Sequence, residues 1–189
     1  MNEEQQQLRE ALKRTAVALK QGSVTYALSG GYASWALGGP EPEHDVDFLV
    51  TEEDAERAEE VLRAAGLRVE QAPEDWLFKA FHGEAMVDIL FHIGGAPAPA
   101  ELIRRARDVE VLSVQMRVLE ATDLLATKMV ALSEHSCDFG TVLPAARALR
   151  EQVDWERLRR DTEHSDFAQA LLYLTDRLAI SPPRSACIH

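Results

Sequence analysis

Apolar residues recur along the chain at two spacings, one typical of helices and the other of strands. Residues 3–21 carry Leu8, Leu12 and Leu19 at helical spacing before Gly22, which predicts an amphipathic helix that ends there. Short apolar runs then predict strands over 24–29, 45–50, 67–71, 76–83, 84–93 and 109–114. Helices are predicted between these strands over 32–39, 52–65 and 97–107, and beyond residue 119 over 120–135, 141–151, 154–162 and 166–179.

This order of elements predicts an α+β fold, because strands alternate with helices in the first half and only helices follow. We expect residues 1–115 to form an α/β core with an N-terminal helix, 116–182 a helical region and 183–189 a tail. A length of 189 residues fits one domain, or one domain with a helical appendage.

The composition narrows the class of protein. Hydrophobic residues make up 46% of the chain and charged residues 28%, which is ordinary for a globular protein and excludes a disordered one. The net charge is −12 and the isoelectric point about 4.9. A protein that neutralises many nucleic-acid phosphates with its own Lys and Arg would not have this balance. Small substrates, metal ions or a locally basic patch remain compatible with it.

The sequence also bears on the compartment. No apolar stretch approaches the roughly 18 residues of a membrane span, and the N-terminal residues lack the apolar segment of a secretion signal. Cys137 and Cys187 are too few for a disulfide framework, so we expect reduced thiols. These features predict a cytoplasmic protein with no membrane partner.

Two aspartates begin the predicted strand 45–50. Asp45 and Asp47 stand two residues apart, so their carboxylates point to one face of the strand while Val46 and Phe48 point to the other. Neighbouring carboxylates repel each other and favour a bound cation or proton, and hard oxygen ligands of this kind suit Mg²⁺. An Asp-x-Asp pair also arises by chance, and the otherwise apolar strand is what favours a functional reading.

A third carboxylate, Asp88, lies in the middle of the predicted strand 84–93, which a turn at His82-Gly83-Glu84 joins to the preceding strand. An acid at such a position is costly unless it has a partner. Asp88 is either a surface residue of an edge strand or, if its strand lies beside that of Asp45 and Asp47, the third member of one acidic site.

Gly30 and Gly31 lie between a predicted strand and a short helix. Glycines there allow backbone N–H groups to approach a phosphate, and the Ser29 hydroxyl is a further donor. The alternative is an ordinary turn, and the stretch is not a Walker A loop because no Gly-Lys-Ser/Thr follows.

The order of these features resembles a known superfamily. The stretch LSGGYASWALGGPEPEHDVDFLV, with VDILF downstream, resembles the minimal nucleotidyltransferases of the DNA polymerase β-like superfamily, which combine a Gly-Gly or Gly-Ser turn, an Asp-x-Asp strand and a third acid on a later strand. GGYA and HDVDF are also similar to small antibiotic nucleotidyltransferases. The stretch 119–149 is similar to the region after the catalytic core in nucleotidyltransferases of the abortive-infection toxin type.

The resemblance implies a fold and a mechanism. The fold is a mixed sheet with flanking helices, followed by a C-terminal helical bundle. Asp45, Asp47 and Asp88 would be the catalytic residues and would hold two Mg²⁺ ions, with Asp88 nearest the incoming hydroxyl. Ser29, Gly30, Gly31 and Lys128 would bind the phosphates of a nucleoside triphosphate (NTP), whose nucleoside monophosphate is transferred to a hydroxyl acceptor while pyrophosphate leaves.

Several residues keep two interpretations. Lys128 is either a solvated flank of its helix or a ligand of the nucleotide phosphates. Asp138 is read as a helix cap in preference to an orienter of the site. Trp35, Trp76 and Trp155 are read as core residues and not as a stacking platform, because they are far apart in the sequence.

The acceptor is left open by the sequence. A tRNA end fits the toxin-like resemblance, and a small hydroxylated molecule such as an aminoglycoside fits the acidic surface. The alternative function is a catalytically silent relative that serves as a binding protein or a toxin–antitoxin partner. The three intact aspartates argue against this alternative.

Overall fold

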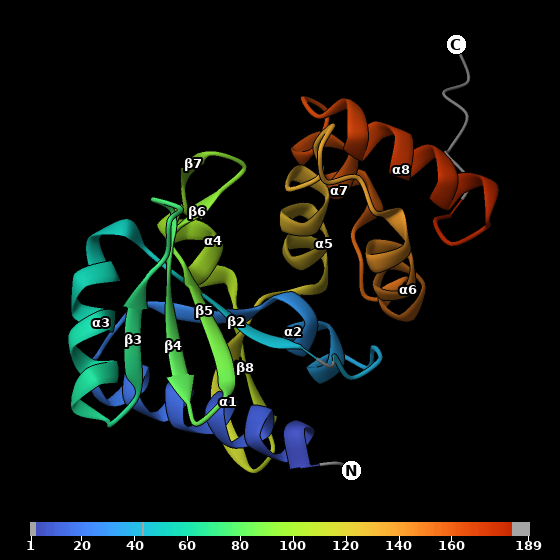
Figure 1. Cartoon of the computed structure of the whole chain (residues 1–189). Coiled ribbons are helices and arrows are strands. Elements are labelled where there is room, and N and C mark those ends of the chain that lie inside the picture. Colours follow the sequence, from blue (N-terminus) through green and yellow to red (C-terminus); the bar gives the residue numbers. More distant parts are fainter. Residues whose placement is uncertain (1–2, 43, 183–189) are drawn as a thin grey trace.

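The computed structural model describes residues 3–42 and 44–182, which form a sheet half and a helical half (Figure 1). The sheet half begins with α1 (Glu3–Gln21), whose buried face includes Leu8, Leu12 and Leu19, as the helical spacing predicts. The helical half contains α5 (Ala121–Val130), α6 (Phe139–Leu149), α7 (Trp155–Asp161) and α8 (Asp166–Arg177).

Seven strands form one mixed sheet in the order β3-β4-β5-β2-β1-β9-β8. The central strand β2 pairs in parallel with β5 and antiparallel with β1. The strands are β1 (Tyr26–Ser29), β2 (Asp45–Val50), β3 (Arg68–Gln71), β4 (Leu77–His82), β5 (Ala85–Leu90), β8 (Arg107–Val111) and β9 (Val114–Val118).

Helices cover one side of the sheet, and a short helix connects the sheet half to the helical half. Helix α1 packs against β2, β4, β5 and β9 and against α3 (Ala55–Ala64). The short helix α2 (Gly30–Ala36) follows β1 directly and contacts α5, so it joins the two halves (Figure 1). This arrangement confirms the expected α+β fold of a mixed sheet with flanking helices and C-terminal helices.

A buried ion-pair cluster also ties α5 to the sheet half. The Asp123 side chain is only 2% exposed and accepts two hydrogen bonds from Arg105, at 2.9 and 3.0 Å. Arg105 is the last residue of α4 (Ala100–Arg105), whereas Arg157 of α7 approaches Asp123 at 3.2 Å from the helical half. Removing either partner from a buried acid is costly, so this cluster fixes the position of α5.

The expected single strand over 109–114 and the helix to residue 107 are wrong. Arg107–Val111 and Val114–Val118 are instead the two strands of a hairpin that turns at Leu112 and Ser113. Both turn residues have positive φ, 52° and 65°. Tight hairpins of this kind usually carry Gly or Asn at these positions, so Leu112 and Ser113 are not recognisable as a turn from the residue types.

Other bounds also differ from the expected ones. The strand expected over 84–93 ends at Leu90, and β6 (His92–Ile93) and β7 (Ala96–Pro97) form a separate small sheet. Helix α5 ends at Val130 instead of residue 135, because Ser133 and Ser136 exchange backbone hydrogen bonds in a turn. Asp138 then caps α6, as expected, by accepting a hydrogen bond from the Gly140 N–H at 2.8 Å.

The expected cap at Thr51 is present, with its hydroxyl accepting from the Asp54 N–H, but the first turn, η1 (Glu52–Asp54), is a 3-10 helix that leads into α3. The division at residue 115 stays a prediction, and the last strand of the sheet extends to Val118. The tail over 183–189, with Cys187, lies outside the described residues. In the described ranges, none of the helices combines the length and apolar character that crossing a membrane requires.

Candidate active site

Three carboxylates meet on one face of the sheet. Because β2 and β5 are parallel neighbours, Asp47 stands directly opposite Asp88, and Asp45 lies two residues before Asp47 on the same face. One oxygen from each of the three carboxylates lies within 4.8 Å of the other two. The intervening Val46 and Phe48 point the other way and are fully buried. The strand alternation therefore brings the three predicted acids together.

The cluster is electrostatically strained without a cation. Burial, reinforced by repulsion from Asp45, raises the pKa of Asp47 to about 7, although Lys128 and the Gly31 N–H act to lower it. Burial also raises the pKa of Asp45, and the negative charge of Asp88 adds to the effect. A cation bound among the carboxylates would relieve both the repulsion and the loss of hydration.

These residues fit a divalent metal ion. Hard carboxylate oxygens suit Mg²⁺, and the three acids supply them from adjacent strands. Among the residues described, this is the one cluster of three or more potential ligands that lies close enough together to hold an ion.

Asp88 has a partner that the sequence analysis missed. The Lys79 ammonium donates a hydrogen bond to the Asp88 carboxylate at 2.9 Å, and the two residues are cross-strand neighbours on β4 and β5. The signal was available, because a tight turn at Gly83 sets the register of the hairpin and places Lys79 opposite Asp88. Asp88 therefore already has one cationic partner within the protein, the Lys79 ammonium.

The two glycines shape the site around Asp47. Gly30 has a φ of +59°, and a Cβ there would lie 1.7 Å from the Asp47 Oδ2 atom, so only glycine fits. The Gly31 N–H lies close enough to Asp47 to lower the pKa of that acid, and a Cβ on Gly31 would lie 2.7 Å from the Pro42 side chain. Gly31 therefore lies at the acidic cluster, and its contact with a phosphate stays a prediction.

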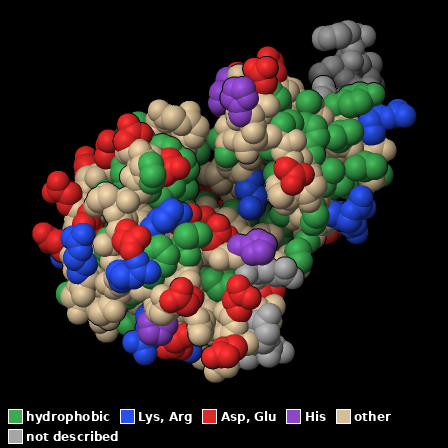
Figure 2. Space-filling model, viewed as in Figure 1, with side chains coloured by type: hydrophobic (Ala, Val, Ile, Leu, Met, Phe, Trp, Pro, Cys, Tyr) green, Lys and Arg blue, Asp and Glu red, His purple; other side chains and the backbone are tan. Residues whose placement is uncertain are grey.

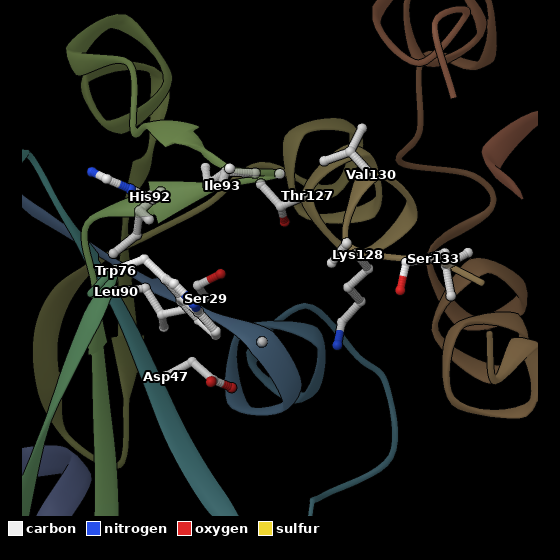
Figure 3. Close-up of a pocket in the computed structure, with 16 residues that line it drawn as sticks. Ser29, Asp47, Trp76, Leu90, His92, Ile93, Thr127, Lys128, Val130 and Ser133 are labelled. Carbon is white, nitrogen blue, oxygen red and sulfur yellow. The ribbon is translucent and has the colours of Figure 1, made fainter. Parts of the chain in front are cut away.

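A cavity of about 560 Å³ lies between this face of the sheet and α5. Ser29, Gly30 and Asp47 line its sheet side, and Lys128 extends into it from α5 on the opposite side (Figure 3). Lys128 is close enough to lower the pKa values of Asp45 and Asp47. The structure therefore places Lys128 at the acidic site and not on the solvated flank considered from the sequence.

Trp76 also lines the cavity, and its assignment to the core is wrong. It is 38% exposed, whereas Trp155 is 6% exposed and packs in the core as expected. Trp35 is partly buried, and the Arg9 guanidinium lies over its ring, with the Arg9 Cζ atom 5.2 Å from the centroid of the Trp35 ring. The exposure of Trp76 depends on the open space between the two halves, which a local sequence pattern does not report.

The surface around the site is predominantly acidic. Figure 2 shows Asp and Glu side chains on the floor of the hollow between the two halves, with Lys and Arg side chains beside them. Acidic side chains also predominate over much of the surrounding face in this view. Such a surface attracts cations and repels polyanions.

Comparison with protein families gives one match. A family model described as an uncharacterised nucleotidyltransferase matches residues 2–181. A comparison with curated proteins finds no match.

Solved structures of similar fold cover nearly the whole chain. The crystal structure of ANT(2")-Ia in complex with adenylyl-2"-tobramycin has a TM-score of 0.58 at 14% identity, covering 88% of this chain and 97% of that one. An antigenic nucleotidyltransferase-like protein from Paracoccidioides brasiliensis has a TM-score of 0.53 at 14% identity, covering 97% of both chains. At these identities the likeness shows a shared fold.

Proposed function

The chain belongs to the family of uncharacterised nucleotidyltransferases, and from this premise we propose that it transfers a nucleoside monophosphate from an NTP to a hydroxyl group of a small acceptor molecule. The observation that carries the proposal is the convergence of Asp45, Asp47 and Asp88 beside a cavity that also contains Lys128. Three carboxylates and a facing ammonium suit phosphoryl chemistry, which depends on positioning and on charge neutralisation.

In the proposed reaction the acceptor oxygen attacks the α-phosphorus, the bond from that phosphorus to the β-phosphate oxygen breaks, and pyrophosphate leaves. Asp88 accepts the proton of the acceptor hydroxyl. Asp45, Asp47 and Asp88 would hold Mg²⁺, as two ions, and the bound metal would neutralise charge on the α-phosphate and the leaving group. Ser29, Gly30 and Gly31 bind the phosphates from the junction where β1 leads into α2.

The charge balance favours a small acceptor over a tRNA end. A net charge of −12 and the acidic face around the site oppose the approach of a nucleic acid backbone. The same charges favour a hydroxylated molecule that carries amines. The structural neighbour ANT(2")-Ia is described in complex with an adenylylated tobramycin, which is a molecule of this kind.

We expect Lys128→Met to raise KM for the NTP by about ten- to a hundredfold. A charge-assisted hydrogen bond to a phosphate contributes roughly 1.5–3 kcal/mol to binding, and the variant loses it. The fold should be kept, because the Lys128 ammonium stands in an open cavity. Steady-state kinetics with varied NTP measure the effect. Lys13→Met is the matched control, since Lys13 lies on α1 and pairs with Glu10. An unchanged KM for Lys128→Met would remove this residue from the nucleotide site.

The decisive test of the proposed function is transfer itself. The protein is incubated with Mg²⁺, each of the four α-³²P-labelled NTPs, and either a panel of aminoglycosides and other polyols or total tRNA. Label on a small acceptor, lost in Asp47→Asn, is the expected result. Label on tRNA would overturn the choice of acceptor. No transfer to any acceptor, with no NTP binding, would favour a silent binding protein or toxin–antitoxin partner.

A further inference from the structure

Trp76 presents a large aromatic surface to the cavity instead of packing it in the core. It lies in the turn before β4, where its backbone carbonyl accepts a hydrogen bond from the Phe91 N–H at 3.1 Å. This bond holds the turn against the end of β5, while 38% of the residue stays exposed. The indole ring of such a tryptophan offers apolar area that a ligand in the cavity can bury.

An apolar wall connects Trp76 to the acids. Leu49 and Leu90 stand opposite each other on β2 and β5, each two residues beyond an acid, so they share the face of Asp47 and Asp88. Both leucines line the cavity, as Trp76 does, and Figure 3 shows Leu90 beside Trp76. The face of the sheet is therefore polar at the acids and apolar from there to Trp76, which matches the polarity of a nucleotide from phosphate to base.

The cavity lies on the nucleotide side of the acidic cluster. It is lined by Ser29, Gly30, Asp47 and Lys128, whereas Asp88 and Lys79 are not among the described residues that line it. The strand order β1-β2-β5-β4 puts the Gly30 turn on one side of the acids and Lys79 on the other. If Asp88 receives the proton of the acceptor, the acceptor lies beside Asp88 and Lys79, outside the residues that line the cavity, and the cavity is left for the nucleotide.

We propose that Trp76 is the stacking platform for the base of the NTP, with Leu49 and Leu90 beneath the sugar and the base. This inference rests on the proposed nucleotidyl transfer and adds the residue that binds the nucleoside. Stacking of a base on an aromatic side chain lowers the dissociation constant by roughly five- to a hundredfold.

The platform recognises the face of the base more than its edge. The Thr127 hydroxyl at the opposite wall donates to the Leu124 carbonyl at 2.8 Å, and the His92 Nε2 atom lies 3.1 Å from the Glu52 carboxylate. These polar side chains already have partners. Because stacking grows with ring area and is tolerant of base identity, purine nucleotides bind more tightly than pyrimidine nucleotides, and ATP and GTP bind similarly.

The test compares two ligands of the full-length protein by isothermal titration calorimetry with Mg²⁺ and no acceptor. One is α,β-methylene-ATP, whose α–β bridge is not cleaved by nucleotidyl transfer, and the other is inorganic tripolyphosphate, which has no base. Trp76→Leu raises the dissociation constant of α,β-methylene-ATP by roughly five- to a hundredfold and leaves that of tripolyphosphate within about twofold. Trp76→Phe, which keeps an aromatic face, recovers most of the lost affinity.

Tryptophan fluorescence gives an independent readout. The nucleotide analogue quenches the wild-type protein and the Trp35→Phe control, and Trp76→Phe loses this quenching. In steady state, Trp76→Leu raises KM for ATP and leaves kcat within a few fold.

Parental affinity of Trp76→Leu for α,β-methylene-ATP would overturn the inference. So would equal weakening of both ligands, because the residue would then act through the fold. Failure of the wild-type protein to bind either ligand would instead refute the proposed function itself.

Discussion

Asp47→Asn is expected to lower kcat/KM for nucleotidyl transfer by about 10³-fold or more and at the same time to stabilise the metal-free protein at neutral pH. The loss of activity follows because Asp47 is the central acid of the cluster and lines the cavity. Removing one carboxylate from a divalent metal site removes several kcal/mol of stabilisation of the transition state. The Asn side chain keeps the size and shape of Asp.

The gain in stability follows from the pKa of Asp47. Its pKa is about 7 in the folded, metal-free protein and 3.8 in the reference state. Between these values the folded protein keeps a proton that the unfolded chain has released, so the free energy of unfolding falls as the pH rises. Below about pH 4 both states are protonated and the penalty is absent; above about pH 7 it reaches roughly 2–4 kcal/mol. Asn carries no charge and avoids it.

Thermal or urea unfolding in EDTA checks this at pH 4.5 and pH 8. The variant should exceed the parent in stability at pH 8 and approach it at pH 4.5. With Mg²⁺ at pH 8 the order should reverse, because the parent alone gains stability from binding the ion. Val46→Ala is the contrasting variant, since Val46 is fully buried and its truncation should destabilise the protein at both pH values. A variant that transfers nucleotide at the parental rate would exclude Asp47 from the site.

The acidic site could be predicted from the sequence because it depends on local geometry. Alternation along a strand places Asp45 and Asp47 on one face whatever the rest of the chain does. The partner of Asp88 was also within reach, since the turn at Gly83 fixes the register that puts Lys79 opposite Asp88. A strand-by-strand pattern does not reveal this pair, because it appears only when the residues are counted outward from the turn on both strands.

The remaining features depend on long-range packing or on unusual backbone conformations. The cavity exists because α5 lies across from the end of the sheet, held by Asp123 and Arg105, residues that are 18 positions apart in the sequence. The exposure of Trp76 follows from that space. The hairpin at Leu112 and Ser113 has positive φ at both turn residues without glycine, so the residue pattern predicts a helix end and a single strand in its place.

Asp88→Asn is expected to reduce kcat by roughly 10²–10⁴-fold with a small change in stability. The catalytic loss follows from the removal of the proposed proton acceptor, which also supplies one of the three carboxylates of the cluster. Two opposing effects decide the stability. The variant relieves the repulsion that raises the pKa values of Asp45 and Asp47, and it leaves Lys79 without its ion pair. The pair is partly exposed and is worth about 1 kcal/mol or less.

Lys79→Gln separates the chemistry of Asp88 from its ion pair. This variant removes the same salt bridge but keeps the Asp88 carboxylate, so it should lower kcat by no more than about tenfold, while Asp88→Asn loses far more. Both are measured by single-turnover transfer with saturating NTP, together with unfolding in EDTA.

If the two variants lose activity equally, the ion pair and not the free carboxylate is what the reaction requires. If Asp88→Asn unfolds, Asp88 is a structural partner of Lys79. A folded Asp88→Asn protein with parental kcat would refute the role of Asp88 as proton acceptor. Among the residues described, no other carboxylate of the cluster lies opposite Lys79, so none of them stands in the place of Asp88.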